Sequence, residues 1–148
     1  MSKALDVQMT TPEKVALQTT ADFVVLPAFG GEMGVLPGHA PFLVQLVPGE
    51  VRVTSGEEVR LFAVSGGFAE IEGNKVALFA ETAEMAGAID AERARQALEK
   101  AKGLAARRDI DPLTLAQAEA AMRRAEVRLR ISQVRRRPGS RSRAPEAQ

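Results

Sequence analysis

The least generic segment of the sequence is residues 30–42, which hold four glycines, two prolines and the only histidine of the chain, His39. A glycine-rich segment can cradle a phosphate, but a phosphate loop needs a Lys-Ser/Thr pair and a helix start after its last glycine. Here His39, Ala40 and Pro41 follow Gly38 instead, and prolines oppose a helix at this point. Nucleotide binding by this segment is therefore excluded.

His39 could also serve as a general base, provided that a nucleophile lies beside it. The chain has no cysteine, and no serine lies close to His39 in the sequence. We therefore expect a structural or interface role for His39 and no catalytic residue, and a small hydrolase is disfavoured for the same reason.

Charge is divided unevenly along the chain. Residues 1–88 hold five Lys/Arg against eleven Asp/Glu, whereas residues 89–148 hold fifteen against eight. Such asymmetry indicates an interaction arm that meets nucleic acid, membrane or an acidic protein surface. A nucleic-acid-binding module with an Arg-rich helix is the alternative function to weigh. The absence of Trp and Tyr argues against it, because single strands are usually held on stacked aromatic side chains.

Length and composition describe an ordinary globular protein. The chain has 148 residues, enough for one domain or two small units, and 45% of them are hydrophobic. Without cysteine there is no disulfide framework and no thiolate metal site. The N-terminus does not resemble a secretory signal, and no apolar run is long enough to span a bilayer. We expect a protein of the cytosolic side.

The elements that position these residues are short strands in the first half of the chain. Alternating or β-branched runs bounded by turn residues predict strands over 5–9, 15–19, 23–26, 42–46, 50–54, 59–64, 67–71 and 75–80. Strands that recur about every ten residues indicate a sandwich or barrel of antiparallel sheet. Because one face of each strand must be covered, we predict two packed sheets over residues 1–86.

The hydrophobic period changes to a helical one after Met85. Asp90 is a good N-cap for a first helix, and Asp111 with Pro112 predicts the start of a second helix that runs to about residue 136. One face of the second helix is expected to be lined by Leu115, Ala118, Met122, Ala125, Leu129 and Ser132. These helices predict a movable antiparallel hairpin over residues 89–137, because Ala-rich faces bury little area. Residues 138–148 should form a disordered tail.

Several motifs in this order resemble the epsilon subunit of the F-type rotary ATP synthase. They are G-E-M-G-V-L-P-G-H-A-P at 31–41, A-V-S-G-G-F at 63–68, Asn74-x-Val76 and I-D-x-x-R-A at 89–94, followed by the two helices. The resemblance extends from residue 5 to about residue 135. It implies an α+β fold, a β-sandwich followed by an α-helical hairpin, which agrees with the periodicity.

The resemblance implies a non-catalytic rotor component that couples proton translocation to ATP synthesis. Its partners would be the gamma subunit, the c-ring subunits and, through the hairpin, the alpha and beta subunits. It would lie at the cytoplasmic face of the inner (plasma) membrane, held there only through the complex. Glu32 matches a position that faces the c ring, Thr11 matches a second one less closely, and His39 belongs to the same candidate contact.

The resemblance also implies that the hairpin regulates the enzyme by extending into the catalytic head and blocking ATP hydrolysis. The basic residues that would meet an acidic segment of the beta subunits are Arg123, Arg124, Arg128, Arg130 and Arg135. A merely solvated basic face is the alternative interpretation.

Some members of the resembled family bind ATP at the folded hairpin. The residues that match this site are Glu84, Ile89, Asp90, Arg93, Ala94, Arg124 and Arg128. Arginine forks suit phosphate oxygens. The same motif is also a capping signal, in which Asp90 caps a helix and Arg93 pairs with a nearby carboxylate. We expect no required cofactor and no metal, and regulatory ATP remains open.

Overall fold

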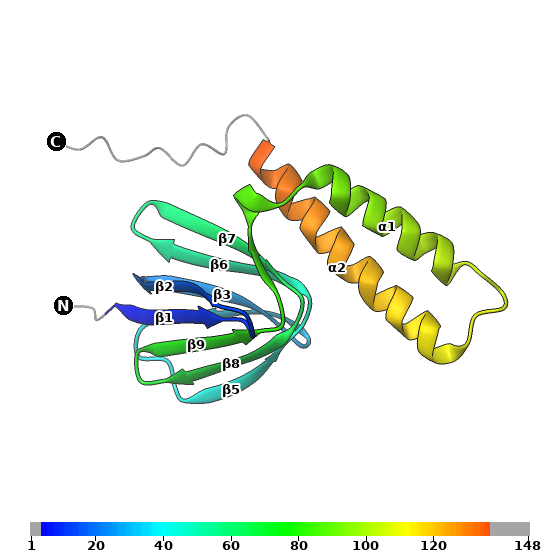
Figure 1. Cartoon of the computed structure of the whole chain (residues 1–148). Coiled ribbons are helices and arrows are strands. Elements are labelled where there is room, and N and C mark those ends of the chain that lie inside the picture. The colour runs from blue at the N-terminus through cyan, green and yellow to red at the C-terminus, as the bar shows by residue number, and fades with distance from the viewer. Residues whose placement is uncertain (1–3, 137–148) are drawn as a thin grey trace.

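The computed structural model describes residues 4–136, and the side chains of residues 4–133. Ten strands come first, followed by a 3₁₀ turn and two α-helices (Figure 1). The elements are β1 (Leu5–Thr10), β2 (Val15–Ala21), β3 (Phe23–Ala28), β4 (Gly31–Val35), β5 (Phe42–Leu46), β6 (Gly49–Ser55), β7 (Glu58–Val64), β8 (Gly67–Glu72), β9 (Lys75–Ala80), β10 (Ala83–Met85), η1 (Ala86–Ala88), α1 (Ala91–Ala105) and α2 (Pro112–Arg136).

The strands form one hydrogen-bonded path in the order β10-β7-β6-β3-β5-β8-β9-β1-β2, and β4 pairs with β3. The path folds over on itself into two packed layers (Figure 1). The expected β-sandwich is therefore confirmed. One pairing differs from the antiparallel expectation, because β1 runs parallel to β9 with Val7 opposite Val76. Sequence alternation does not reveal which strand lies beside which.

The core lies between the two layers and is built by alternation along each strand. In β1, Leu5, Val7 and Met9 are buried while Asp6 and Gln8 are exposed. The inward residues form one continuous cluster that includes Val24, Leu26, Val35, Val51, Val53, Phe62, Ile71, Val76 and Leu78. Burial of this apolar surface holds the sandwich together, at about 25 cal/mol per Å².

Two short strands were not expected from the sequence. β4 lies inside the glycine-rich segment, where Gly30 and Gly31 turn the chain with φ of 90° and 140°. β10 pairs with β7 and places Glu84 opposite Ala63. Both strands are short or rich in glycine, so their period-two pattern is weak.

The two helices begin directly after Asp90 and Asp111, the capping residues expected from the sequence. The Asp90 carboxylate accepts hydrogen bonds from the amides of Glu92 and Arg93 at 3.0 and 3.2 Å. The Asp111 carboxylate accepts from the Thr114 amide and hydroxyl at 2.9 and 2.6 Å. α1 and α2 pack side by side as an antiparallel pair (Figure 1).

The hairpin contacts the sandwich mainly through the second half of α2. Val127 and Ile131 of α2 form a small buried cluster with Ala63 of β7 and Ala86 of η1. The far end of the hairpin projects beyond the sandwich (Figure 1). Because this cluster is small, its burial stabilises the docked hairpin far less than the main core stabilises the sandwich.

The tail over 138–148, for which we expected disorder, lies outside the described residues. Within the described part of the chain, neither helix is apolar enough over its length to cross a membrane.

Candidate functional site

A groove of about 340 Å³ lies where the hairpin meets the sandwich. Its lining comes from β7, the β7–β8 and β9–β10 connections, β10 and the two helices. The lining residues are Ala63, Val64, Ser65, Thr82, Glu84, Ala97, Ala121, Arg124, Ala125 and Arg128. The volume falls at the lower end of the usual range for small-molecule sites, about 300–1,000 Å³. The helix residues that line the groove are mostly alanines, whose small side chains leave space next to Arg124 and Arg128.

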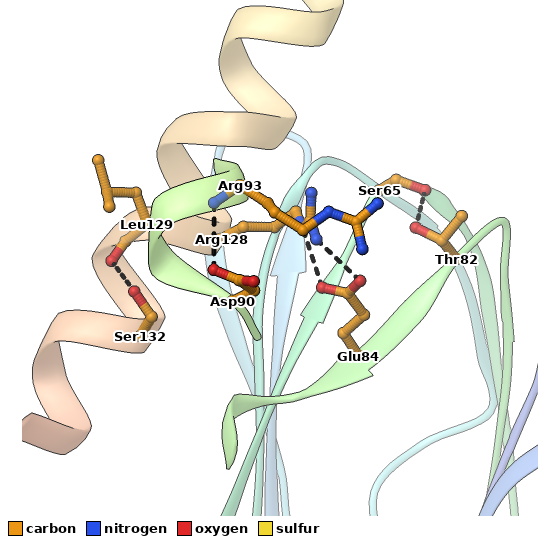
Figure 2. A network of polar contacts seen from close by, with 8 residues as sticks. All are labelled: Ser65, Thr82, Glu84, Asp90, Arg93, Arg128, Leu129 and Ser132. Carbon is orange, nitrogen blue, oxygen red and sulfur yellow. Dashed lines mark hydrogen bonds and ion pairs between the residues drawn. The ribbon is translucent and has the colours of Figure 1, made fainter. Parts of the chain in front are cut away.

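Glu84 and Arg128 form a two-point ion pair at the edge of this groove (Figure 2). Arg128 Nε donates to Glu84 Oε2 at 2.8 Å, and Nη2 donates to Oε1 at 3.0 Å. The Arg128 side chain is 32% exposed and the Glu84 side chain is 38% exposed. This fork-to-fork geometry is the strongest form of an arginine–carboxylate contact. It joins β10 to α2.

Two further arginines surround the pair. Arg124 lies one helical turn before Arg128 and lines the groove. Figure 2 shows the Arg93 side chain extending from the first turn of α1 in the direction of Glu84. Within residues 4–133, neither Arg93 nor Arg124 takes part in an ion pair. The groove therefore carries more positive than negative charge, which favours an anionic ligand.

The remaining residues of the I-D-x-x-R-A motif have structural roles. Ile89 packs against the small cluster around Ile131, Asp90 caps α1, and Ala94 is fully buried. The structure thus brings Glu84, Arg124 and Arg128 into the groove lining and leaves Ile89, Asp90, Arg93 and Ala94 outside it.

Sequence reasoning missed two hydroxyl groups in the groove. Thr82 Oγ1 donates to Ser65 Oγ at 2.8 Å, beside Glu84 (Figure 2). In the sequence these two hydroxyl residues are marked only by their neighbours. Ser65 directly precedes the glycine pair at 66–67, and Thr82 directly precedes strand β10, which was itself not predicted. It also missed Val127 and Ile131, which lie off the face predicted for α2 and bind the sandwich.

The basic side chains of α2 differ in availability. Arg123, Arg124 and Arg130 are exposed, whereas Arg128 is half-buried and turned toward Glu84. Arg135 belongs to α2, but its side chain lies outside the described ones. Three arginines of α2 are thus exposed in the docked state.

Glu32 and Thr11 lie at the same end of the sandwich, where β1, β3, β5 and β9 end. Glu32 is exposed on β4 and forms an ion pair of 3.1 Å with Arg52. The Thr11 hydroxyl closes the β1–β2 turn by donating to the Lys14 carbonyl at 3.2 Å. The Glu32 carboxylate is thus paired with Arg52 and remains exposed enough to contact another subunit.

The structure does not bring His39 to that end. The neighbouring amide of Gly38 donates to Asn74 Oδ1 at 2.9 Å, in the β8–β9 turn near the start of β1. His39 Nδ1 lies 2.6 Å from the Ala40 carbonyl oxygen. Gly38 and the two prolines of residues 36–41 therefore shape a loop that is tied to the opposite end of the sandwich.

Apolar side chains are exposed on the outer face of β5, β8 and β9. Phe68 and Phe79 are cross-strand partners, Gln45 lies opposite Phe68, and Leu43 shares that face. Leu43, Phe68 and Phe79 are 70%, 57% and 50% exposed. Contiguous exposed apolar surface of this kind marks an interaction site. Over the described residues, no cluster of His, Asp and Glu suits a metal ion.

Comparison with known proteins gives consistent matches. Residues 4–86 match the family model described as "ATP synthase, Delta/Epsilon chain, beta-sandwich domain". The ATP synthase epsilon chain of Syntrophobacter fumaroxidans is 41% identical over 133 residues, which cover 90% of this chain and 98% of the relative. The epsilon chain of Nitratidesulfovibrio vulgaris is 41% identical over 131 residues, covering 88% and 97%.

Solved structures agree with the sequence matches. A chain of the Euglena gracilis mitochondrial ATP synthase, solved as OSCP/F1/c-ring, superposes with a TM-score of 0.74 at 28% identity, covering 83% of this chain and 78% of that chain. A central-stalk/c-ring structure of the Tetrahymena thermophila mitochondrial enzyme gives 0.62 at 17% identity, covering 90% and 97%. The second match supports the fold alone.

Proposed function

Since the chain belongs to the delta/epsilon chain family of ATP synthases, it is a non-catalytic subunit of the central stalk, and we propose that its hairpin regulates ATP hydrolysis by leaving the sandwich. The subunit is part of a membrane-associated complex that couples proton transport to ATP synthesis. We place it at the cytoplasmic face of the inner (plasma) membrane, in contact with lipid only through the complex.

The sandwich provides two contact surfaces for the rotor. We assign the apolar outer face around Leu43, Phe68 and Phe79 to the gamma subunit, because these side chains are large and exposed. We assign the end that carries Glu32 and Thr11 to the c ring. Retention of gamma and ring subunits by the purified chain tests both assignments, and Phe68→Ser should reduce retention of gamma while leaving the ring contact intact.

The observation that carries the inhibitory role is the small contact between hairpin and sandwich. Val127 and Ile131 bury only a small apolar surface against Ala63 and Ala86, and one ion pair supplements it. A contact of this size can open and close, because a two-state element needs a gap of only a few kcal/mol. Once released, the basic face with Arg123 and Arg130 would meet an acidic surface of the beta subunits and, through them, the catalytic head formed with alpha.

Removal of the hairpin tests this role. A chain that ends at residue 88, reconstituted with the remaining subunits, should support faster ATP hydrolysis than the full chain. Equal rates would count against inhibition. Charge attraction between the hairpin and the beta subunits should also weaken with salt, so inhibition by the full chain should decrease as ionic strength rises.

The groove between hairpin and sandwich supports regulatory ATP as a second role. Arg124 and Arg128 line it and Arg93 extends toward it. The Arg128 fork is engaged by Glu84, so Arg93 and Arg124 supply the guanidinium forks for phosphate oxygens. Glu84, Ser65 and Thr82 add acceptors and hydroxyl groups beside them. These residues fit a nucleotide phosphate chain. ATP bound there would hold the hairpin docked, because it contacts both parts of the chain.

Isothermal titration of the full chain with millimolar ATP tests this role. Heat of binding is expected, and Arg124→Gln should weaken the affinity about tenfold or more, the usual effect of losing a hydrogen bond to a charged group. Arg130→Gln is the matched control, since Arg130 is an exposed arginine of the same helix outside the groove lining. A titration without heat would remove the proposal.

A further inference from the structure

Glu32 is bound by an arginine that lies across strand β3 from it. In the antiparallel register, Glu32 of β4 is opposite Pro27 of β3, and Arg52 of β6 is opposite Val25 of the same strand. Residues that are opposite or two apart point to the same face of a sheet. Both side chains therefore lie on the outer face, where Arg52 Nη2 donates to Glu32 Oε2 at 3.1 Å.

Arg52 is itself held by a second carboxylate. Its Nε lies 3.6 Å from Glu50 Oε1, and the side chains of Glu50, Arg52 and Glu32 are 20%, 41% and 67% exposed. The guanidinium is thus fixed on its inner side by the better-buried carboxylate and reaches outward to the exposed one. A planar fork holds its donors in fixed directions, whereas the ammonium of a lysine is a compact charge on a flexible stem and would leave Glu32 less restricted.

The carboxylate that Arg52 holds lies at the rim of an apolar hollow. The hollow measures about 330 Å³ and includes Phe29, Met33 and Phe42 in its lining together with Glu32. Phe29 is 87% exposed at the β3–β4 turn and adds to the apolar surface around the hollow. The ion pair therefore fixes the one acidic group of a surface that is otherwise suited to apolar contact.

We propose that Arg52 is a positioning residue for the contact between Glu32 and the rotor ring, an inference that rests on the ring assignment of Glu32. A free glutamate loses rotamer freedom when it docks, and that loss weakens binding. Arg52 restricts Glu32 before docking, so the carboxylate meets the ring already oriented. This effect is distinct from charge, because Arg52 lowers the negative potential around Glu32 and on charge alone would weaken attraction to a cationic ring loop.

The test is a double-mutant cycle in the complete F1 assembly, with affinity for the detergent-solubilised rotor ring as the readout. The variants are Glu32→Gln, Arg52→Gln, Arg52→Lys and the double change Glu32→Gln with Arg52→Gln. Arg60→Gln is the control, because Arg60 forms a comparable exposed pair with Glu58 at 2.9 Å on the neighbouring strand. Thermal melting of each free chain reports on folding.

We expect Arg52→Gln and Arg52→Lys each to weaken ring binding about twofold to fivefold, the range of an exposed ion pair. Arg52→Gln should have no further effect on ring binding once Glu32 is glutamine. Unchanged binding by Arg52→Lys, tighter binding by Arg52→Gln, or a loss that persists in the Glu32→Gln background would overturn the positioning role. If Glu32→Gln itself leaves affinity unchanged, the ring assignment of Glu32 fails and the inference fails with it.

Discussion

The Glu84 carboxylate accepts two hydrogen bonds from Arg128, from Nε at 2.8 Å and from Nη2 at 3.0 Å, although the residues are 44 positions apart. Among residues 4–133, the side-chain hydrogen bonds that join the sandwich to the hairpin are those between Glu84 and Arg128. It lies beside the small apolar contact made by Val127 and Ile131. The docked state of the hairpin therefore depends on one polar contact and one small cluster.

Glu84→Gln should loosen the hairpin, because the amide keeps the size of the carboxylate and loses its charge. The pair is about a third exposed, so we expect a loss of about 1 kcal/mol in docking free energy. Hydrogen exchange over residues 126–132 measures it and should become faster. Glu92→Gln is the control, since it breaks the Arg95–Glu92 pair within α1. Equal protection in Glu84→Gln and the unchanged chain would show that the pair does not hold the hairpin.

Gly67→Ala should severely destabilise the sandwich. Gly67 has φ of +126°, and an added Cβ would lie 2.0 Å from the carbonyl oxygen of Phe79, a contact that the paired strand β9 can relieve only by shifting. We expect a loss of about 3 kcal/mol or more in unfolding free energy. Gly73→Ala is the matched comparison, because Gly73 also has positive φ but an open surrounding, so its loss should be about 1 kcal/mol. Denaturant titration of both variants measures the difference, and equal losses would contradict the contact argument.

Gly103→Ala should stabilise the hairpin. Gly103 lies within α1, and an added Cβ would meet nothing within 4 Å. Alanine is favoured over glycine in a helix interior by about 0.8–1 kcal/mol, so the thermal midpoint of the variant should rise. A lower midpoint would mean that α1 needs glycine at this position for another reason.

The cap of α2 should depend on pH. Hydrogen bonds from the Thr114 hydroxyl and amide lower the pKa of Asp111 below its ordinary value of 3.8. A depressed carboxyl pKa contributes stability above the unfolded value, and that contribution is lost as pH falls through the folded value. Helicity of α2 should therefore decrease below pH 3.8.

Asp111→Asn separates this titration from others, because asparagine also caps helices but does not ionise in this range. Comparing circular dichroism of both chains between neutral and strongly acidic pH should show a smaller acid-induced loss in the variant. Parallel curves would assign the loss to other carboxylates.

Most of the fold could be predicted because helix caps and strand alternation depend on residues that are close together in the sequence. Asp90 and Asp111 cap their own helices, and the alternation in β1 and β6 follows directly from burial of one face. Pairing is not local, so the parallel contact between β1 and β9 could not be foreseen. β4 was missed because its glycines weaken the alternating pattern.

The candidate groove was foreseen in part. Of the residues that the motif resemblance assigned to an ATP site, Glu84, Arg124 and Arg128 line the groove, whereas Ile89 and Ala94 pack against apolar neighbours. Val127 and Ile131, which pack α2 against the sandwich, were not predicted. A helix that contacts both α1 and the sandwich has apolar residues on two faces, whereas the predicted pattern was a single apolar stripe. The partner of Glu32 was missed for the same reason as the strand pairing: Arg52 is distant in sequence.

We propose that the hairpin must leave the sandwich to inhibit ATP hydrolysis, and a crosslink between the two tests this most directly. The chain has no cysteine, so Glu84→Cys and Arg128→Cys can be joined by a short bismaleimide in the isolated subunit before it is reconstituted with the remaining subunits. The ATP hydrolysis rate of the assembled complex is then compared with that of the uncrosslinked double variant and of reagent-treated unchanged chain. We predict a higher rate when the hairpin is locked to the sandwich, and an unchanged or lower rate would contradict the account.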